Sequence, residues 1–390
     1  MTKKRILLVS GIQVFPPISG GHLRTVNLAK ALSSEGFDVE IFSLTGRREE
    51  YLRGAGSARS KISDNVTEFV YRGKLFGLMQ FVSYKLGWPP IWLTYLARYF
   101  VPSSLSSKLE YAEHVIWDFP FVFNLARKSP SAINVLNTHN IESELYNSSF
   151  WKKVVGGIEA RALANADFVL FSSRRDFEKS RLNESKASII PNGLDLNDYS
   201  HAEKNAIKKL RDFYDISNNS KVIVFSASKY PANVVALNNL CNWVSENEDL
   251  LRKESVFFLV VGSVSEKDKR NKFIRFEGRV EDMLPYFQMC DYFINPVTSG
   301  SGVNVKMMEY IAMRKPILST RFGARGLHLE HKKSCFYFDF DDLRQVLIEA
   351  LANKDIYQMT EKAFDDNLHS ISMSKSVSQM LVKQKSLSNS

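Results

Sequence analysis

The residues best suited to chemistry lie in the stretch 295–320, which reads NPVTSGSGVNVKMMEYIAMRKPILST. Its pattern predicts a strand, a glycine-rich turn, a helix over about 303–313 and a second strand. The free backbone amides and aligned dipole at the start of such a helix attract phosphate. Lys306 and Glu309 are three residues apart and share one helical face. They would offer a cation to a diphosphate and a carboxylate to a ribose diol; the alternative is a capped helix with a solvent-exposed ion pair.

The rest of the chain predicts an α/β protein with two domains, each with the same alternation of strands and helices. Short apolar runs alternate with helical patterns through both halves of the sequence, and this spacing predicts parallel sheets. The turn in IIPNGLD marks a boundary, so we expect one domain over 1–193 and a second over 194–364. A helix at about 365–385 is expected to pack back on the first domain. Ligands of such sheets bind at the carboxyl ends of the strands, hence in a cleft where the two domains face each other.

The net charge of +10 is unevenly distributed over the 390 residues. Residues 69–109 contain no Asp or Glu, and their Lys and Arg side chains are interleaved with large aromatic ones. This mixture suits an anionic membrane interface. The alternative is a helical pair whose aromatic side chains are core. Nucleic acid is a weaker candidate, because no recognisable binding module accompanies the charge.

The compartment is expected to be cytoplasmic, with possible peripheral attachment to the inner face of the membrane. No apolar run is long enough to span a bilayer, and the first apolar stretch reads as a strand. The three cysteines are far apart and show neither zinc-site nor disulfide spacing. The sequence DFDD at 339–342 is interpreted as a helix cap, so no metal site is predicted.

The stretch 295–320 resembles the nucleotide-binding signature of the family-4 retaining glycosyltransferases of GT-B fold. Glu309 matches the second of that family's two motif glutamates, which holds the ribose hydroxyls. Ser301 stands where the first glutamate is usual, a position that touches the donor sugar, so the resemblance leaves the sugar open. The form SGSG…K..E resembles a variant subgroup with this serine. The resemblance covers about residues 4–352, with 51–111 matching only in general pattern.

Other segments carry the resemblance into both domains. ISGGHLRTVNLAKALSSEGFDVEIFSL resembles the family's N-terminal loop, NTHNIESELY its histidine segment, FSASKYPANVVALNNL the opening of the second domain, and FEGRVEDMLPYFQMCDYFINP the segment near the base. The resemblance implies catalytic roles for His139, Lys229, Lys306 and Glu309. It implies donor binding by Gly20, Gly21, Asn233, Arg279, Gly300, Ser301, Gly302, Val303 and Asn304. Acceptor-side candidates are Arg24, Asn140 and Glu142; for Arg24 the alternative is a phosphate contact or a solvated side chain, and for His139 a structural histidine.

The implied activity is transfer of a sugar from a UDP- or GDP-sugar to a glycan or lipid-linked acceptor, with retention and without metal or cofactor. Bacterial surface-polysaccharide synthesis would suit such an enzyme. Fixed cations would stabilise the departing nucleoside diphosphate. Two alternatives remain, an inactive or binding-only relative and a sugar-nucleotide epimerase of the same fold. A nicotinamide-dependent oxidoreductase lacks the required G-x-G-x-x-G after the first strand.

Overall fold

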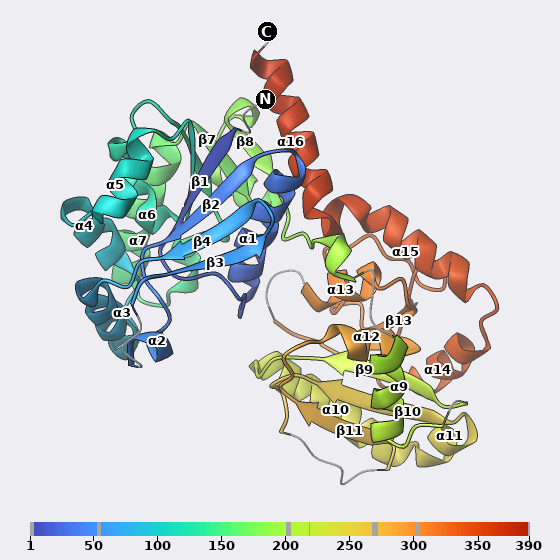
Figure 1. Cartoon of the computed structure of the whole chain (residues 1–390). Helices are drawn as coiled ribbons and strands as arrows, with labels where there is room; N and C mark the ends of the chain where they lie inside the picture. The colour runs from blue at the N-terminus through green and yellow to red at the C-terminus, as the bar shows by residue number, and fades with distance from the viewer. Residues whose placement is uncertain are drawn as a thin grey trace. The chain divides into compact units, whose positions relative to one another are not determined.

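The computed structural model describes residues 4–52, 56–199, 204–217, 219–266, 272–300 and 305–388. The chain forms two compact α/β units (Figure 1). Unit 1 comprises Met1–Asp195 and Ser372–Ser390, and unit 2 comprises Leu196–Ile371. In the described part of the chain, no helix is long and apolar enough to cross a membrane.

Unit 1 is built on a sheet of order β3-β4-β2-β1-β5-β6-β7-β8, in which only the β3–β4 pair at one edge is antiparallel. The order reverses between β1 and β5, which lie side by side in the middle of the sheet. The strands are β1 (Arg5–Ser10), β2 (Asp38–Ser43), β3 (Ala58–Ser63), β4 (Val66–Val70), β5 (His114–Asp118), β6 (Ile133–Asn137), β7 (Phe168–Phe171) and β8 (Ala187–Ile189).

Helices cover both faces of this sheet, as parallel strands that are apolar on both sides require. One core lies under α3 to α7, and the other lies between the sheet, α1 and α16. Figure 1 shows α16 beside α1, although the two are far apart in sequence. The helices are α1 (Gly20–Ser34), α2 (Arg48–Leu52), α3 (Lys74–Leu86), α4 (Ile91–Tyr99), α5 (Ser103–Glu110), α6 (Pro120–Phe123), α7 (Ser149–Asn165), α8 (Arg174–Ser180) and α16 (Met373–Ser388).

Unit 2 has a fully parallel sheet of order β11-β10-β9-β12-β13-β14, which is the dinucleotide-fold order with its reversal between β9 and β12. Its strands are β9 (Lys221–Ser226), β10 (Val256–Val261), β11 (Ile274–Gly278), β12 (Tyr292–Asn295), β13 (Ile317–Ser319) and β14 (Phe336–Tyr337). Its helices are α9 (Lys204–Phe213), α10 (Pro231–Glu246), α11 (Glu248–Lys253), α12 (Leu284–Met289), α13 (Val305–Ala312), α14 (Leu343–Ala352) and α15 (Ile356–Ile371).

The end of the chain differs from the single helix expected over 365–385. Helix α15 ends at Ile371 and α16 begins at Met373. Between them, Ser372 forms a parallel bridge with Leu194, whose carbonyl accepts a hydrogen bond from the Met373 amide. This backbone contact replaces the helical continuation, and the break cannot be read from the helical pattern of the side chains.

Candidate functional site

The strand reversal in unit 2 brings two loops together at the carboxyl ends of β9 and β12. The loop after β9 leads into α10, and the glycine-rich turn after β12 leads into α13. In open α/β sheets, a crevice at such a reversal is where ligands bind. The sequence-predicted residues of unit 2 that the structure brings together lie here.

Lys306, in the first turn of α13, is held by contacts with the start of α10 and with β9. Its Nζ donates to Asn233 Oδ1 at 3.0 Å and lies 4.6 Å from the centre of the Phe225 ring. Asn233 is fixed in turn, since its Nδ2 donates to the Ser228 carbonyl at 2.9 Å. Burial lowers the pKa of Lys306 to about 7, although Glu309 opposes the shift. An anion bound here would restore the full charge of the ammonium group.

Glu309 lies one turn further along α13 and accepts a hydrogen bond from the Tyr199 hydroxyl at 3.1 Å. Burial raises the pKa of Glu309 to about 7, and Tyr199 and Lys306 offset part of that effect. Tyr199 ends the 3-10 turn Leu196–Tyr199 at the start of unit 2. Sequence analysis missed it, because nothing in the local pattern links it to a helix more than a hundred residues away.

The turn before α13 requires glycine at position 300. Gly300 has φ +127°, a conformation that side chains with a Cβ rarely adopt. A Cβ placed there would lie 3.7 Å from Ala232 Cβ and 3.9 Å from Arg325 Nη2. Arg325, which sequence analysis also missed, thus brings a second cation to this turn; its guanidinium stacks 3.9 Å from the Phe322 ring centre. The predicted residues Ser301, Gly302, Val303 and Asn304 lie outside the described residues.

Two other predicted residues of unit 2 have exposed side chains. Lys229 lies in the loop after β9, where its main-chain amide donates to Ser263 Oγ at 3.1 Å. Arg279 follows the end of β11. No hydrogen bond between described residues joins either side chain to the Lys306 and Glu309 group, so their roles stay predictions.

In unit 1 the strand reversal between β1 and β5 holds a buried carboxylate, Asp118. Both of its oxygens accept hydrogen bonds. Ser10 Oγ at 3.2 Å and Thr25 Oγ1 at 3.0 Å contact Oδ2, while Asn137 Nδ2 at 2.8 Å and His139 Nε2 at 2.7 Å contact Oδ1. Burial alone would raise the pKa of Asp118, but His139 and these hydrogen bonds hold it below its usual value. Sequence analysis did not single out Asp118, although its position as the last residue of the strand HVIWD places it at the end where ligands bind.

His139 is oriented by this carboxylate and by the ring of Phe119. The two rings stack with centres 4.0 Å apart, at an angle of 6°. The other ring nitrogen, Nδ1, is buried and has no hydrogen-bond partner among the described residues. A Cβ on Gly21 would lie 3.2 Å from this nitrogen, so glycine permits the close approach of α1. Gly20 begins α1 directly after its N-cap, Ser19, whose side chain accepts from the His22 amide.

Arg24, predicted on the acceptor side, is buried and used within unit 1. Its guanidinium donates to the carbonyls of Ile190 and Pro191 and, at 2.9 Å, to Asn137 Oδ1. Burial lowers the pKa of Arg24 to about 10. These contacts tie α1 to the segment after β8, which gives this arginine a structural explanation and rules out the solvated alternative. Asn140 is exposed.

Glu142 lies at a cavity of about 300 Å³ in unit 1. Its side chain is 5% exposed, and its Oε1 is buried without a hydrogen-bond partner among the described residues. Its main-chain amide donates to Glu159 Oε1 at 2.9 Å. Burial raises the pKa of Glu142 to about 8, with Glu159 and Asp118 adding to the effect. The cavity is lined by Gly11, Ile12, Thr45, Gln80, Ser83, Tyr84, Trp88, Pro90, Trp92, Leu93, Asp118, Phe119, Phe121, Val122 and Glu142.

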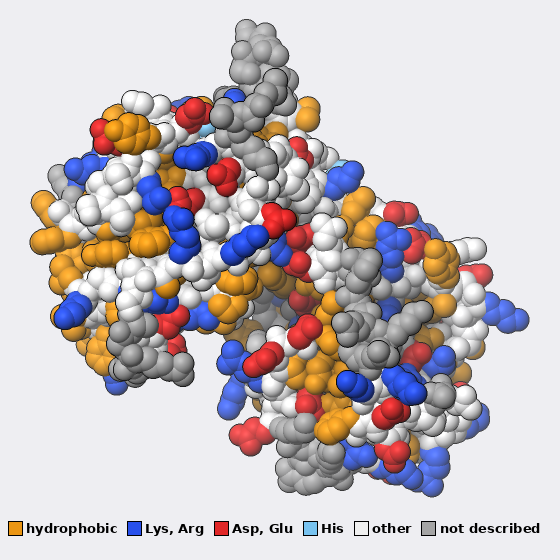
Figure 2. Space-filling view, in the orientation of Figure 1, with side chains coloured by type: hydrophobic (Ala, Val, Ile, Leu, Met, Phe, Trp, Pro, Cys, Tyr) orange, Lys and Arg blue, Asp and Glu red, His pale blue; other side chains and the backbone are white. Residues whose placement is uncertain are grey.

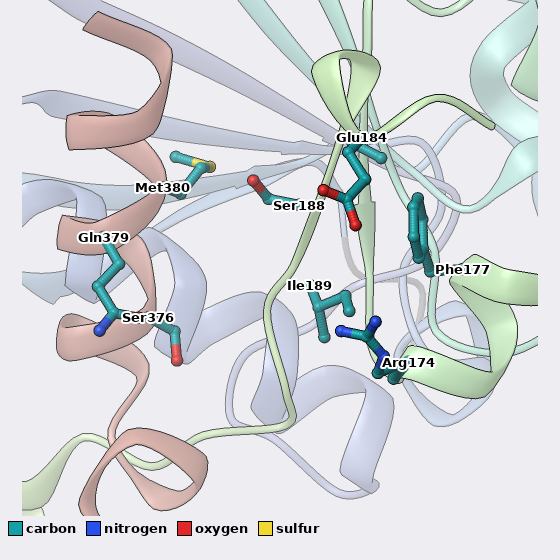
Figure 3. Close-up of a pocket in the computed structure, with 9 residues that line it drawn as sticks. Arg174, Phe177, Glu184, Ser188, Ile189, Ser376, Gln379 and Met380 are labelled. Atoms are coloured by element: carbon teal, nitrogen blue, oxygen red, sulfur yellow. The ribbon is translucent and has the colours of Figure 1, made fainter. Parts of the chain in front are cut away.

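A separate hollow of about 290 Å³ lies between the α8–β8 segment and α16, at some distance in sequence from every predicted site residue. Figure 3 shows Arg174 and Glu184 on one side and Gln379 and Met380 on the other. It contains neither the Asp118 group nor the Lys306 group. Among the described residues, no cluster of three or more His, Cys, Asp or Glu could hold a metal ion.

Comparison with known proteins identifies the class of fold. Residues 220–353 match the family described as "Glycosyl transferases group 1", which covers most of unit 2. A search of curated proteins found no significant match. Solved structures match over almost the whole chain, and they show that the protein has the GT-B fold, with two Rossmann-like domains.

Three of these structures illustrate the match. The Anabaena protein Alr3699/HepE in complex with UDP and glucose is 15% identical, with a TM-score of 0.63, 99% of this chain covered and 100% of that one. A glycosyltransferase from Rickettsia africae is 16% identical, with a TM-score of 0.65 and full coverage of both chains. The E. coli trehalose-6-phosphate enzyme bound with UDP-2-fluoro glucose is 12% identical, with a TM-score of 0.62, 98% of this chain covered and 99% of that one.

Proposed function

We propose that the protein is a glycosyltransferase that takes a sugar from a nucleoside-diphosphate donor bound in unit 2. The observation that carries this proposal is the arrangement of Lys306, Asn233 and Glu309 at the β9/β12 reversal. It lies within the stretch that matches group 1 glycosyl transferases. A cation beside a glycine turn and a carboxylate one helical turn further suit a diphosphate and a ribose diol respectively.

The donor in this proposal is a UDP-sugar. The structures of Alr3699/HepE and of the E. coli enzyme hold UDP or a UDP-sugar, and the present chain has the same fold. A GDP-sugar is the other candidate. Arg279, exposed after β11, is the proposed contact near the base. The presence of Ser301 at the position that usually touches the sugar leaves the hexose itself to experiment.

In the proposed reaction, the bond between the anomeric carbon and the β-phosphate oxygen breaks while the acceptor oxygen bonds to the same face of that carbon. The acceptor proton passes to the departing phosphate, so the anomeric configuration is retained. Lys306 and Arg325, with the exposed Lys229 as a third cation, would stabilise the nucleoside diphosphate as it leaves. Fixed cations in these positions support a reaction without metal; unchanged turnover in excess EDTA is the expected result.

The proposal is tested by the variant Glu309→Ala. Loss of the ribose contact should reduce donor-dependent UDP release at least 100-fold and weaken UDP binding in isothermal titration calorimetry. Glu246→Ala, an exposed position on α10, is the matched control and should behave as wild type. Wild-type turnover in Glu309→Ala would reject the donor site. UDP binding without release, or interconversion of the sugar without acceptor, would favour a binding-only relative or an epimerase instead.

We further propose that the enzyme works on the cytoplasmic face of an anionic membrane, on a glycan or lipid-linked acceptor of surface-polysaccharide assembly. Hydrophobic side chains gather over α3 and α4 (Figure 2), in the segment 69–109 that lacks acidic residues. Lys74 and Lys85 are exposed there, and each basic residue near an anionic leaflet contributes about 1 kcal/mol.

Vesicle co-sedimentation tests the membrane proposal. Wild type should bind vesicles containing phosphatidylglycerol and be released by high salt, and it should bind neutral phosphatidylcholine vesicles weakly. Reversing both charges, Lys74→Glu with Lys85→Glu, should weaken binding at least about 30-fold, since two contributions of about 1 kcal/mol are lost and repulsion is added. Lys186→Glu, an exposed residue elsewhere in unit 1, is the control. Equal binding of all three proteins would reject the proposal.

A further inference from the structure

The cavity of unit 1 has two walls of different chemistry. One wall comes from the hairpin of α3 and α4, which contributes Tyr84, Trp88 and Trp92. The other wall comes from the ends of strands β1, β2 and β5, where the sheet order reverses. A volume of about 300 Å³ reaches the lower end of the range of small-molecule sites. The cavity is therefore large enough for one sugar-sized ring.

The buried end of this cavity is polar, and one of its buried oxygens lacks a hydrogen-bond partner among the described residues. Asp118 is fully buried, and its oxygens are already occupied by four donors. Glu142 is almost as buried, but its Oε1 has no partner among the described residues. Buried polar atoms in folded proteins are nearly always paired. The free oxygen of Glu142 thus indicates a ligand group that completes this end.

The charge state of Glu142 indicates which ligand group can bind at the buried end of the cavity. Its carboxyl faces Glu159 from α7 and Asp118 from β5, and burial together with the nearby Glu142 raises the pKa of the Tyr146 hydroxyl. The side chains that line the cavity from α3 and α4 are uncharged. Below about pH 8 Glu142 is protonated and can donate a hydrogen bond, while Asp118 repels anions. An uncharged hydroxyl group fits this end.

The other end of the cavity is apolar and open. Tyr84 is 73% exposed and Trp88 is 50% exposed, in contrast to Phe121 and Val122 at 2% and 1%. The hairpin carries further exposed apolar side chains beyond the cavity, among them Leu78 and Leu86. An apolar chain leaving the cavity would therefore contact the exposed rings of Tyr84 and Trp88, which favours its removal from water.

We propose that this cavity binds the reacting end of an amphipathic acceptor, with a hydroxylated, uncharged ring against Glu142 and an apolar chain along Tyr84 and Trp88. The inference rests on the proposed glycosyltransferase function and names the class of its acceptor. Asp118 acts here as a positioning residue through His139, since its own oxygens are occupied. Glu142 contacts the ring directly. A free, fully polar glycan would leave the exposed surface of Tyr84 and Trp88 in water.

The experiment uses n-octyl glucoside below its critical micelle concentration as the probe, with methyl glucoside and 1-octanol for comparison. Binding is measured by tryptophan fluorescence and calorimetry on the full chain at pH 6.5 and 9. We expect octyl glucoside to bind at least 10-fold more tightly than either comparison compound. Trp88→Ala and Glu142→Ala should each weaken it about 10-fold, and Tyr111→Ala, at an 81% exposed position outside the cavity, should leave it unchanged.

The pH dependence separates a specific site from general detergent binding. Wild-type affinity should fall between pH 6.5 and 9 as Glu142 loses its proton, whereas Glu142→Gln, which keeps the donor, should bind equally at both values. Equal binding of octanol, or no effect of Trp88→Ala and Glu142→Ala, would overturn the inference. UDP titration of the same samples distinguishes the two failures. If wild type does not bind UDP, the proposed function is rejected. If wild type binds UDP but not octyl glucoside, only this inference is rejected.

Discussion

The protonated state of Glu142 makes the stability of unit 1 depend on pH in a specific direction. An unfolded glutamate has a pKa of 4.5, and burial near Glu159 and Asp118 raises that of Glu142 to about 8. Between these values the folded state holds one more proton than the unfolded state. The free energy of unfolding then falls as pH rises, by about 1.4 kcal/mol per pH unit. Above about pH 8 the loss is complete.

Replacing Glu142 by Gln removes this dependence while keeping the shape and the hydrogen-bond donor. Across the interval from 4.5 to about 8 the slope integrates to about 5 kcal/mol as an upper limit. Burial also raises the pKa of Glu159, so the uptake of protons on folding is divided between the two carboxyls. We therefore expect Glu142→Gln to be more stable than wild type by about 2–4 kcal/mol at pH 8. At pH 4.5 the two proteins should be nearly equal.

Urea unfolding at pH 4.5, 6, 7 and 8, followed by tryptophan fluorescence, measures this difference. Four of the five tryptophans lie in unit 1, at positions 88, 92, 117 and 151, so the signal reports mainly on the relevant unit. Glu110→Gln, an exposed position in the same unit, is the control and should follow wild type at every pH. A stability difference between Glu142→Gln and wild type that is the same at all four pH values would refute the reasoning, because it would mean that Glu142 titrates normally.

Three further predictions concern other parts of the structure. UDP affinity should be greatest near pH 7, because Lys306 must hold its proton and Glu309 must lose its own. In calorimetry, the affinity of Glu309→Gln should no longer fall at acid pH, and that of Lys306→Arg should no longer fall at alkaline pH. Arg24→Met should lower the free energy of unfolding of unit 1 by about 3 kcal/mol, measured in urea, because it leaves buried carbonyls unpaired, and it should leave UDP affinity unchanged. Gly21→Ala should reduce turnover, since its Cβ would lie 3.2 Å from Nδ1 of His139; wild-type turnover in that variant would contradict this.

The sequence was sufficient to predict the fold and the helix that carries Lys306 and Glu309 in unit 2. The alternation of apolar runs and helical patterns depends on local periodicity, and it predicted two α/β domains with parallel sheets. The resemblance of 295–320 to a family signature implied the GT-B fold, which the comparisons confirm. Lys306 and Glu309 could be predicted because both belong to one helix, where spacing determines which side chains share a face. The antiparallel β3–β4 edge and the short helices of 74–110 lacked such clear signals.

Residues that reach a site from distant segments could not be predicted in this way. Tyr199 and Arg325 lie beside the α13 motif because of the way unit 2 folds, and neither has a local pattern of its own. Asp118 contacts His139 only because β5 and β6 are neighbours in the sheet. Arg24 shows the reverse case. Its position near the start of α1 suggested a ligand contact, whereas its guanidinium donates to backbone carbonyls 166 and 167 residues further along the chain and to Asn137 Oδ1.

In both units, the candidate sites contain ionisable groups whose charged form is disfavoured by burial. Burial moves the pKa of Lys306 and that of Glu309 toward neutrality in unit 2, and it keeps Glu142 protonated in unit 1. A fully charged, buried and poorly paired group would cost the ligand-free protein several kcal/mol. A diphosphate would restore the charge of Lys306, and a hydroxyl group would give Glu142 the partner it lacks. Strongly shifted pKa values in the two strand-reversal loops are therefore a physical reason to place ligands there, independent of any resemblance to other proteins.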